Sequence, residues 1–322
     1  MQTQSGVLSA VGVFFASLSV FYAAPASAQV SQLRNWVSSA GDDANASIGC
    51  NRATPCRTFA QAVALTIPEG EINCVDAGSY GSLTIDRSIT IDCTGTLGAV
   101  LASGSFGIRI NTPGVKVVLR GISISGVTGA HNGIRFLQGA SLTIIDSLIT
   151  NFTSASGGNA IAFDPSTTAE LHIVNTVLAK NRRGILVSPT GNGSANVTLD
   201  RVTVNDNVEG LRVLTTNSAG SGAFVVATGS TFSGNGTGMA LVTPAGTNFA
   251  VAKLVNSTIS SNTGVGLLAD GPTVRADVAG STITNNGTGV SAINGSILLS
   301  YVDNLTDRNG VDGVFTGSVS KR

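Results

Sequence analysis

Apolar and polar residues alternate along short segments throughout the second half of the chain. The segments Val197-Thr198-Leu199, Val202-Thr203-Val204 and Leu211-Arg212-Val213 each carry an apolar side chain at every second position. This period is typical of a β-strand with one buried face. Sets of three such strands, joined by tight corners, recur along the sequence. The pattern therefore predicts a coil of three short strands that repeats many times.

An asparagine closes the same short phrase in six copies, at intervals of 24 to 30 residues. The six residues are Asn151, Asn181, Asn205, Asn235, Asn262 and Asn286. A short repeat of this kind predicts a solenoid, and its strand pattern specifies a parallel β-helix. Equivalent positions in successive coils stack about 4.8 Å apart. We therefore expect a structural ladder in which each asparagine adopts the left-handed conformation and bonds to the next.

The segment before the repeats is expected to cap the solenoid. Residues Thr58–Leu65 have apolar side chains at helical spacing, with Thr58 as N-cap and Pro68 just beyond the end. A cap is needed because the first coil otherwise exposes its interior and a strand edge. We expect an N-terminal loop and capping helix over 29–70, the β-helix over 71–316 and a tail over 317–322.

Longer segments separate some of the strands. Four follow the third strand of a coil and a fifth separates Asn151 from Ile161; the four are 188–196, 214–223, 243–250 and 269–276. Insertions between coils lie at a corner of a solenoid and commonly form its binding face.

The N-terminus resembles a secretory signal peptide. Residues 7–24 are apolar, and Ala26-Ser27-Ala28 is a small-x-small cleavage site. This predicts a signal peptide over 1–28, cleavage before Gln29 and a secreted or periplasmic protein. The first four residues lack the usual basic side chains, so a retained membrane anchor is the alternative, although the apolar run is marginal in length for spanning. No other segment is apolar enough to span a bilayer.

Four cysteines fit an oxidising compartment. Cys50 and Cys56 bracket a short loop, while Cys74 and Cys93 stand in two similar phrases that adjacent coils would stack. We expect these two pairs, although four cysteines allow three pairings. Zinc is not supported, because the only histidines, His131 and His172, lie far along the chain.

Composition and charge limit the partners. The chain of 322 residues has 18 basic and 18 acidic residues, and charged residues make up 11%. Binding of nucleic acid needs a large basic excess, so none is expected. The 40 glycines suit tight corners. We expect one elongated monomer.

Several short motifs in the cap and first coil resemble the pectin-lyase-like superfamily. They are Thr58-Phe59-x-x-Ala62-Val63, Gly70-Glu71-Ile72, Gly78-x-Tyr80 and Ile85-x-x-Ser88-Ile89-Thr90-Ile91. With the repeats, the chain resembles a secreted bacterial right-handed parallel β-helix protein over about 36–316. The resemblance implies this all-β fold with an N-terminal capping helix. It leaves activity open, because the superfamily contains lyases, hydrolases, esterases, epimerases and members without a known reaction.

Catalytic motifs of the superfamily are absent from the repeats. The hydrolases' paired aspartates occur only as Asp42-Asp43 in the N-terminal segment, and the lyases' Trp-x-x-Asp-His phrase is missing because Trp36, the single tryptophan, precedes the repeats. Calcium would be required only for a lyase, and the available acidic residues follow no calcium spacing. We therefore expect no cofactor.

An arginine recurs in one strand of the coil. The phrases Gly107-Ile-Arg109, Gly133-Ile-Arg135 and Gly210-Leu-Arg212 place apolar neighbours inward and each arginine outward on one face. Ala162 and Leu186 interrupt the row. Arginine binds carboxylates through two parallel donors, which suits an acidic sugar chain, although a solvated face is the simpler explanation. His131 lies close to Arg135 and is a candidate acid or base.

Three functions remain open. The first is binding of an extended polysaccharide or another surface partner through Arg109, Arg135, Arg212 and His131. The second is a lyase or glycoside hydrolase acting on acidic glycans, and the third is a structural surface or adhesion protein. We favour binding, because no catalytic constellation is recognisable.

Overall fold

The computed structural model describes residues 1–3, 31–243 and 248–320. The expected signal peptide and its cleavage position before Gln29 lie outside the described residues, apart from the first three positions. Among the residues described, no helix combines the length and apolar character needed to cross a membrane.

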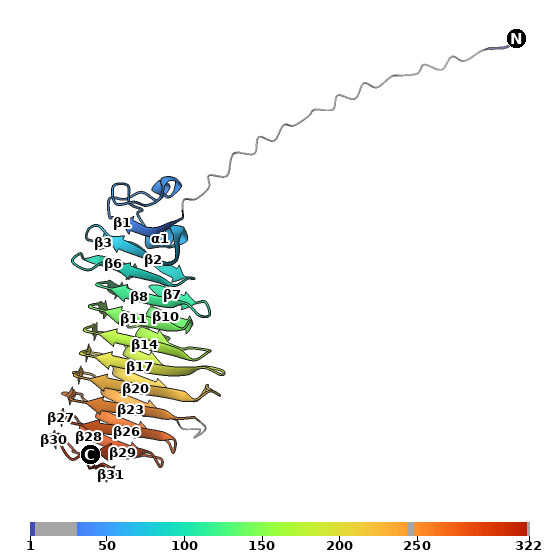
Figure 1. Ribbon diagram of the computed structural model, residues 1–322. Helices are drawn as coiled ribbons and strands as arrows, with labels where there is room; N and C mark the ends of the chain where they lie inside the picture. Colours follow the sequence, from blue (N-terminus) through green and yellow to red (C-terminus); the bar gives the residue numbers. More distant parts are fainter. Residues whose placement is uncertain (4–30, 244–247, 321–322) are drawn as a thin grey trace.

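The described strands form three parallel sheets of 12, 10 and 9 strands wound into a solenoid (Figure 1). Sheet 1 contains β1 Gln32–Val37, β2 Thr66–Cys74, β5 Ile89–Asp92, β8 Lys116–Arg120, β11 Ser141–Ile145, β14 Ala169–Val174, β17 Ser194–Asp200, β20 Gly222–Thr228, β23 Ala250–Val255, β26 Val274–Ala279, β29 Ile297–Ser300 and β31 Gly317–Ser318. Sheet 2 contains β3 Gly78–Ser79, β6 Gly98–Ala102, β9 Ser123–Gly126, β12 Leu148–Thr150, β15 Val177–Ala179, β18 Thr203–Asn205, β21 Thr231–Ser233, β24 Thr258–Ser260, β27 Thr282–Thr284 and β30 Leu305–Asp307. Sheet 3 contains β4 Leu83–Ile85, β7 Ile108–Asn111, β10 Asn132–Gln138, β13 Asn159–Phe163, β16 Arg183–Val187, β19 Glu209–Leu214, β22 Thr237–Val242, β25 Val265–Asp270 and β28 Thr288–Ile293.

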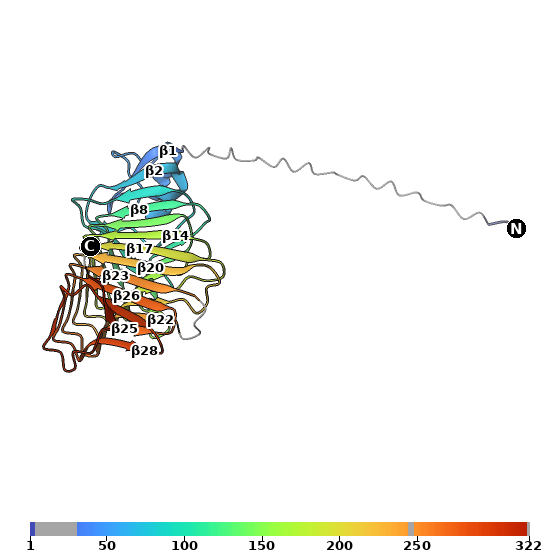
Figure 2. The ribbon, with the colours of Figure 1, turned by 60° about the horizontal axis from the view of Figure 1, so that its bottom comes forward.

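The chain passes through sheets 1, 2 and 3 in turn, so each strand pairs with strands one coil away. For example, β17 pairs in parallel with β14 and β20. In Figure 2, β22, β25 and β28 of sheet 3 form a face separate from that of β20, β23 and β26 of sheet 1. The predicted parallel β-helix with three strands per coil is confirmed.

Apolar side chains stack in rows inside the solenoid. Ile134, Ile161, Ile185 and Leu211 are register partners in consecutive strands of sheet 3, and all are fully buried. Full burial of such a side chain contributes about 2 kcal/mol. The interior rows therefore fix which residues of each strand face outward.

A short helix covers the first coil. The helix α1, Phe59–Leu65, begins after Thr58, whose hydroxyl accepts a hydrogen bond from Gln61 N at 3.2 Å. It buries Phe59 and Leu65, and a 3-10 helix, η1 Asp43–Ile48, precedes it. Paired strands extend beyond the expected limits of 71–316, with β1 at one end and β31 at the other.

Two disulfides tie the N-terminal end together. They join Cys50 to Cys56 and Cys74 to Cys93, the two pairs expected from the sequence. The second pair joins adjacent coils, because Ile72 and Ile91 are register partners. Gly98 packs against this disulfide, and a Cβ atom there would lie 2.5 Å from Cys93 Sγ and 2.7 Å from Cys74 Sγ. Only glycine leaves enough space.

The asparagine ladder lies at the corner between sheets 2 and 3. The side-chain amide of each asparagine donates to the oxygen of the next, at 2.8 to 3.1 Å. The ladder consists of Asn181, Asn207, Asn235, Asn262, Asn286 and Asn309. Each Oδ1 also accepts the backbone N–H of the preceding ladder residue. The corner's backbone donors are thereby satisfied.

Two of the predicted ladder positions are wrong. Asn205 lies in β18 and bonds to Asp206, while Asn207 takes the ladder position. Asn151 is exposed, and its neighbour Phe152 occupies the equivalent position, with its backbone N–H bound to Asn181 Oδ1 at 3.0 Å. Phe152 is fully buried, so an apolar side chain ends the ladder.

The left-handed conformation falls one residue earlier than expected. The residues before the ladder asparagines have φ between 56° and 65°; they are Lys180, Asp206, Gly234, Ser261, Asn285 and Arg308. These residues make the turn, which leaves the following asparagine free to point inward along the stack.

A second ladder, of hydroxyl groups, occupies the corner between sheets 1 and 2. Ser230 N donates to Ser257 Oγ, and Ser257 N donates to Ser281 Oγ, both at 3.1 Å. Ser147 N likewise donates to Thr176 Oγ1 at 3.3 Å. The repeated phrase thus carries a hydroxyl for one corner, an apolar residue for the core and an asparagine for the other corner.

The longer segments divide between two corners. The four that follow the third strand join sheet 3 to sheet 1, as their flanking strands show. The fifth, between β12 and β13, joins sheet 2 to sheet 3 instead. This fifth segment lies beside the start of β10, where Ser156 Oγ is 3.3 Å from His131 Nε2.

Candidate functional site

The row of arginines lies on the outer face of sheet 3 in the order expected. Arg109 on β7 is the register partner of Arg135 on β10, and Arg135 is followed by Ala162 on β13. Leu186 then precedes Arg212 on β19. The row is therefore interrupted for two coils.

Arg109 and Arg212, at the two ends of this row, already contact other side chains. The Arg109 guanidinium carbon lies 5.9 Å from the centroid of the Phe106 ring, within the range of a cation–π contact. Arg212 Nη1 binds Glu209 Oε1 at 2.5 Å, and Arg183 Nε donates to the other oxygen of the same carboxylate. Burial alone would raise the pKa of Glu209, but the hydrogen bond from Arg183 and the charge of Arg212 lower it. Glu209 therefore binds both arginines, one through each carboxylate oxygen.

A pocket of about 230 Å³ opens on the same face across β10, β13 and β16. Its polar lining includes His131, Arg135, Asn159, Asp164 and Arg183. Thus the structure brings together two of the candidate residues, His131 and Arg135. Arg109 and Arg212 lie in the same row but outside the lining.

Two buried polar atoms in this pocket have no hydrogen-bond partner. Asn159 Nδ2 donates to Asn132 Oδ1 at 2.8 Å, but Asn159 Oδ1 accepts nothing. Arg135 Nε is likewise unpaired, although 43% of the Arg135 side chain is exposed. Because both atoms are buried, a ligand in the pocket would meet Arg135 through the exposed part of its side chain.

Asp164, directly after β13, is the carboxyl group of the pocket. Its side chain is 17% exposed, and its Oδ2 lies 4.0 Å from Arg135 Nε, too far for a hydrogen bond. Burial raises the pKa of Asp164 to about 6, against the opposing charge of Arg135. His131 lies at the edge, with its Nε2 3.3 Å from Ser156 Oγ of the fifth longer segment.

The sequence did not identify Asn159 and Asp164 as parts of a site, although a signal existed. Asn159-Ala-Ile-Ala-Phe163 repeats Asn132-Gly-Ile-Arg-Phe136 one coil later, and the structure pairs the two segments residue by residue. Aligning these phrases would have placed Asn159 beside Asn132 and Ala162 beside Arg135. Asp164, which follows immediately, would then have fallen next to the arginine row.

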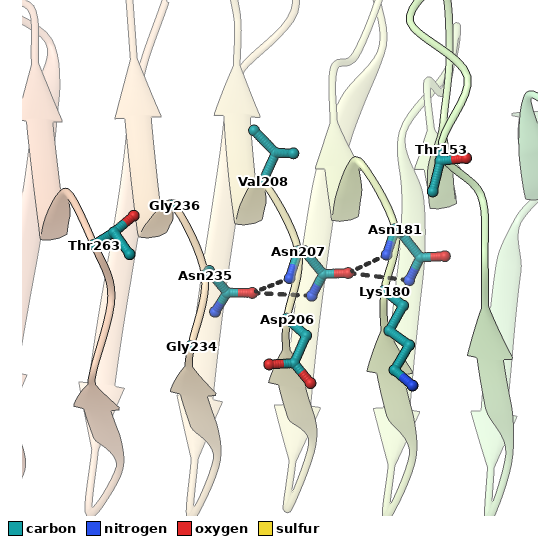
Figure 3. A pocket seen from close by; sticks show the side chains of 10 residues that line it. All are labelled: Thr153, Lys180, Asn181, Asp206, Asn207, Val208, Gly234, Asn235, Gly236 and Thr263. Carbon is teal, nitrogen blue, oxygen red and sulfur yellow. Dashed lines mark hydrogen bonds between the residues drawn. The ribbon is translucent and has the colours of Figure 1, made fainter.

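A larger pocket, of about 590 Å³, lies outside the asparagine ladder. Figure 3 shows Asn181, Asn207 and Asn235 joined to one another along its floor, with Lys180 and Asp206 beside them. The ladder side chains are committed to the scaffold, so this pocket is a weaker candidate. Across residues 31–243 and 248–320, no group of three or more His, Cys, Asp or Glu side chains is placed to hold a metal ion.

The fold resembles that of a solved polysaccharide lyase. Pectate lyase Pel9A superposes with a TM-score of 0.64 and 14% identity, over 92% of this chain and 80% of that chain. The A-modules of two mannuronan C-5 epimerases from Azotobacter vinelandii also match, both at 13% identity. AlgE4 has a TM-score of 0.36 over 79% of this chain and 91% of its own. AlgE6 has a TM-score of 0.37, with 89% and 87%.

No protein-family model matches the sequence, and no curated protein matches it. At the identities found, the likeness concerns the fold. The chain is therefore a parallel β-helix protein with a polar pocket on the outer face of sheet 3.

Proposed function

We propose that the protein binds an acidic polysaccharide along the outer face of sheet 3, with one sugar carboxylate held in the pocket at Arg135. The observation that carries this proposal is Arg135 itself, which lines the pocket with 43% of its side chain exposed and lies too far from Asp164 for a hydrogen bond. A sugar carboxylate would accept hydrogen bonds from the exposed part of the guanidinium. The likeness to a pectate lyase supports this class of ligand.

The shape of sheet 3 suits an extended chain. Parallel strands about 4.8 Å apart present their outward residues in straight rows. Arg109 and Arg135 are neighbours in such a row, and the pocket lies at its interrupted end. A linear glycan laid across the strands would therefore meet Arg109 and Arg135 in succession.

We also propose export of the protein. Its two disulfides need an oxidising compartment to persist, and the apolar N-terminus with a small-x-small site is typical of a cleaved signal peptide.

Substitution Arg135→Ala tests the binding proposal. We expect it to weaken binding of oligogalacturonate or oligomannuronate at least tenfold, because a charge-assisted contact contributes about 1.5–3 kcal/mol. Arg120→Ala is the matched control: Arg120 is 44% exposed and lies 4.0 Å from Asp92, but on the outer face of sheet 1. Isothermal titration calorimetry measures both. Equal losses in the two variants, or no binding by the unmodified protein, would contradict the proposal.

Catalysis on such a glycan is the second candidate, favoured by one observation. A carboxyl with a pKa of about 6 beside an arginine is suited to transfer protons near neutral pH. Incubation of uronate polysaccharides with the protein, with and without Ca²⁺, tests it through release of unsaturated or reducing ends. Asp164→Asn should abolish any product formed, and product that persists in this variant would contradict a role for Asp164.

A further inference from the structure

We infer that binding in the pocket is coupled to protonation of Asp164, so that an anionic ligand binds most tightly when this carboxyl is neutral. This inference rests on the proposed function. It concerns regulation of the site, because the Asp164 carboxylate, which repels an anionic ligand, is part of the protein.

Asp164 and a ligand carboxylate compete for the same guanidinium. Asp164 Oδ2 lies 4.0 Å from Arg135 Nε, close enough for charge attraction but not for a hydrogen bond. Arg135 therefore remains available to a ligand through its exposed side chain, while an ionised Asp164 places negative charge at the same pocket. An anionic ligand is attracted by the Arg135 guanidinium and repelled by the ionised Asp164 carboxylate.

The other charged groups do not remove this competition. From β16, Arg183 faces the pocket but is bound to Glu209 of β19, which also holds Arg212. From β7, Arg109 stands beside Arg135 in the row. Just before β10, His131 also lines the pocket. The test therefore includes a substitution of His131 beside that of Asp164.

Burial sets the pH range of the coupling. It raises the pKa of Asp164 to about 6, whereas an ordinary exposed carboxylic acid has a pKa near 4. Between about pH 4 and 6 the ligand is charged while Asp164 is mostly neutral. Above this range Asp164 is ionised, repels the ligand and attracts Arg135. Affinity should therefore rise as pH falls through 6, and decline again once the ligand itself is protonated.

The size of the effect follows from linkage. If the ligand raises the pKa of Asp164 by about one unit, its affinity changes about tenfold across the transition, because proton and ligand affect each other equally.

Calorimetric titration with oligogalacturonate at about pH 5 and about pH 7.5 tests the inference, with the methyl ester of the same oligomer as uncharged comparison. We expect the unmodified protein to bind the free acid about tenfold more tightly at the lower pH. Asp164→Asn should bind with the same affinity at both pH values, close to that of the unmodified protein at the lower pH. His131→Gln should keep the pH dependence. Circular dichroism establishes that each variant is folded.

The outcomes separate the two proposals. Binding that is equally tight at both pH values would overturn the coupling and leave the proposed function standing. A pH dependence that persists in Asp164→Asn but disappears in His131→Gln would assign the effect to His131 and also overturn the coupling. Absence of binding at either pH, with oligomannuronate giving the same result, would contradict both the coupling and the proposed function.

Discussion

At the scale of single residues, Asp164 stands out because its charge is incompletely compensated. Glu209 of β19, also part-buried, receives hydrogen bonds from two arginines, and the pKa of Glu209 is lowered. Asp164 has one arginine at 4.0 Å, and burial prevails, so its pKa is raised. Two carboxyl groups on one sheet face thus have opposite pKa shifts, because only one of them is fully hydrogen-bonded.

Ionising Asp164 should therefore cost stability in the folded protein. The unfolded chain ionises this group near pH 4, but the folded protein does so only near 6, so stability falls between these values and stays lower above them. Asp164→Asn should raise the free energy of unfolding near neutral pH by about 3 kcal/mol, because the pKa differs by about two units at ~1.4 kcal/mol per unit. Urea denaturation at about pH 7 and about pH 4 measures this.

The gain should shrink to about 0.5 kcal/mol at the lower pH, where the folded protein is protonated at Asp164 and the unfolded chain is about half protonated. Asp200→Asn serves as control, because Asp200 is 36% exposed and paired with Arg201 at 2.8 Å. A variant of Asp164 that is no more stable than the unmodified protein near neutral pH would show that Arg135 fully compensates the burial.

At the scale of structural elements, the asparagine ladder holds the coil in register. Asn207 donates to Asn235 Oδ1 at 3.0 Å and to Leu178 O at 3.1 Å, and its own Oδ1 accepts from Asn181. Asn207→Ala would leave these buried groups unpaired, so we expect a loss of about 3 kcal/mol. Asn205→Ala, two residues away, should cost about 0.5 kcal/mol or less, because Asn205 lies outside the ladder. Thermal and urea denaturation compare the two variants.

Equal losses from the two substitutions would place Asn205 and Asn207 in equivalent roles and contradict the ladder's register. A larger loss from Asn205→Ala would restore the register first expected from the sequence.

The strands and the fold were predictable because alternation with a period of two defines a buried face. The same period explains the error at Asn205. Val202 and Val204 are both fully buried, so a shift by two residues keeps every side chain on its proper face. Periodicity does not distinguish the two alignments, and only the hydrogen bonds at the corner do.

The error at Asn151 has a different cause. Leu148 and Ile149 are adjacent apolar residues, but Leu148 is 42% exposed and Ile149 is fully buried. Asn151 therefore lies one residue before the ladder position, which Phe152 occupies. The pocket was only partly predictable: repeated phrases placed Arg109 beside Arg135, but the burial of Asp164 depends on packing among several coils.

At the scale of the whole molecule, covalent links are concentrated at one end of the solenoid. Cys50–Cys56 and Cys74–Cys93 span separations of 6 and 19 residues, and both lie in the cap and first coils. Since each coil of a solenoid contacts only its neighbours, their stabilisation should remain local.

Replacement of both Cys74 and Cys93 by serine should lower stability by about 3 kcal/mol through loss of the loop constraint. Hydrogen exchange should accelerate in β2 and β5 and remain unchanged in β20 and β23. Replacement of both Cys50 and Cys56 by serine provides the comparison. The loop between them is smaller, so we expect a loss of about 2 kcal/mol. Uniformly faster exchange along all three sheets would show that the solenoid unfolds as one cooperative unit instead.

The ladder also gives the solenoid an electrical polarity. Every amide in it has its oxygen toward the preceding coil and donates its N–H to the next, so the amide dipoles align as they do in a helix. The positive end of this array is Asn309, whose Nδ2 and backbone N–H both donate to Asp312 Oδ1, at 2.9 and 3.1 Å. The positive end of the dipole array stabilises the Asp312 carboxylate there, as a helix N-terminus stabilises an acidic residue. Any coil stacked beyond this point would have to present an oxygen in place of Asp312, and a lysine or arginine would be repelled.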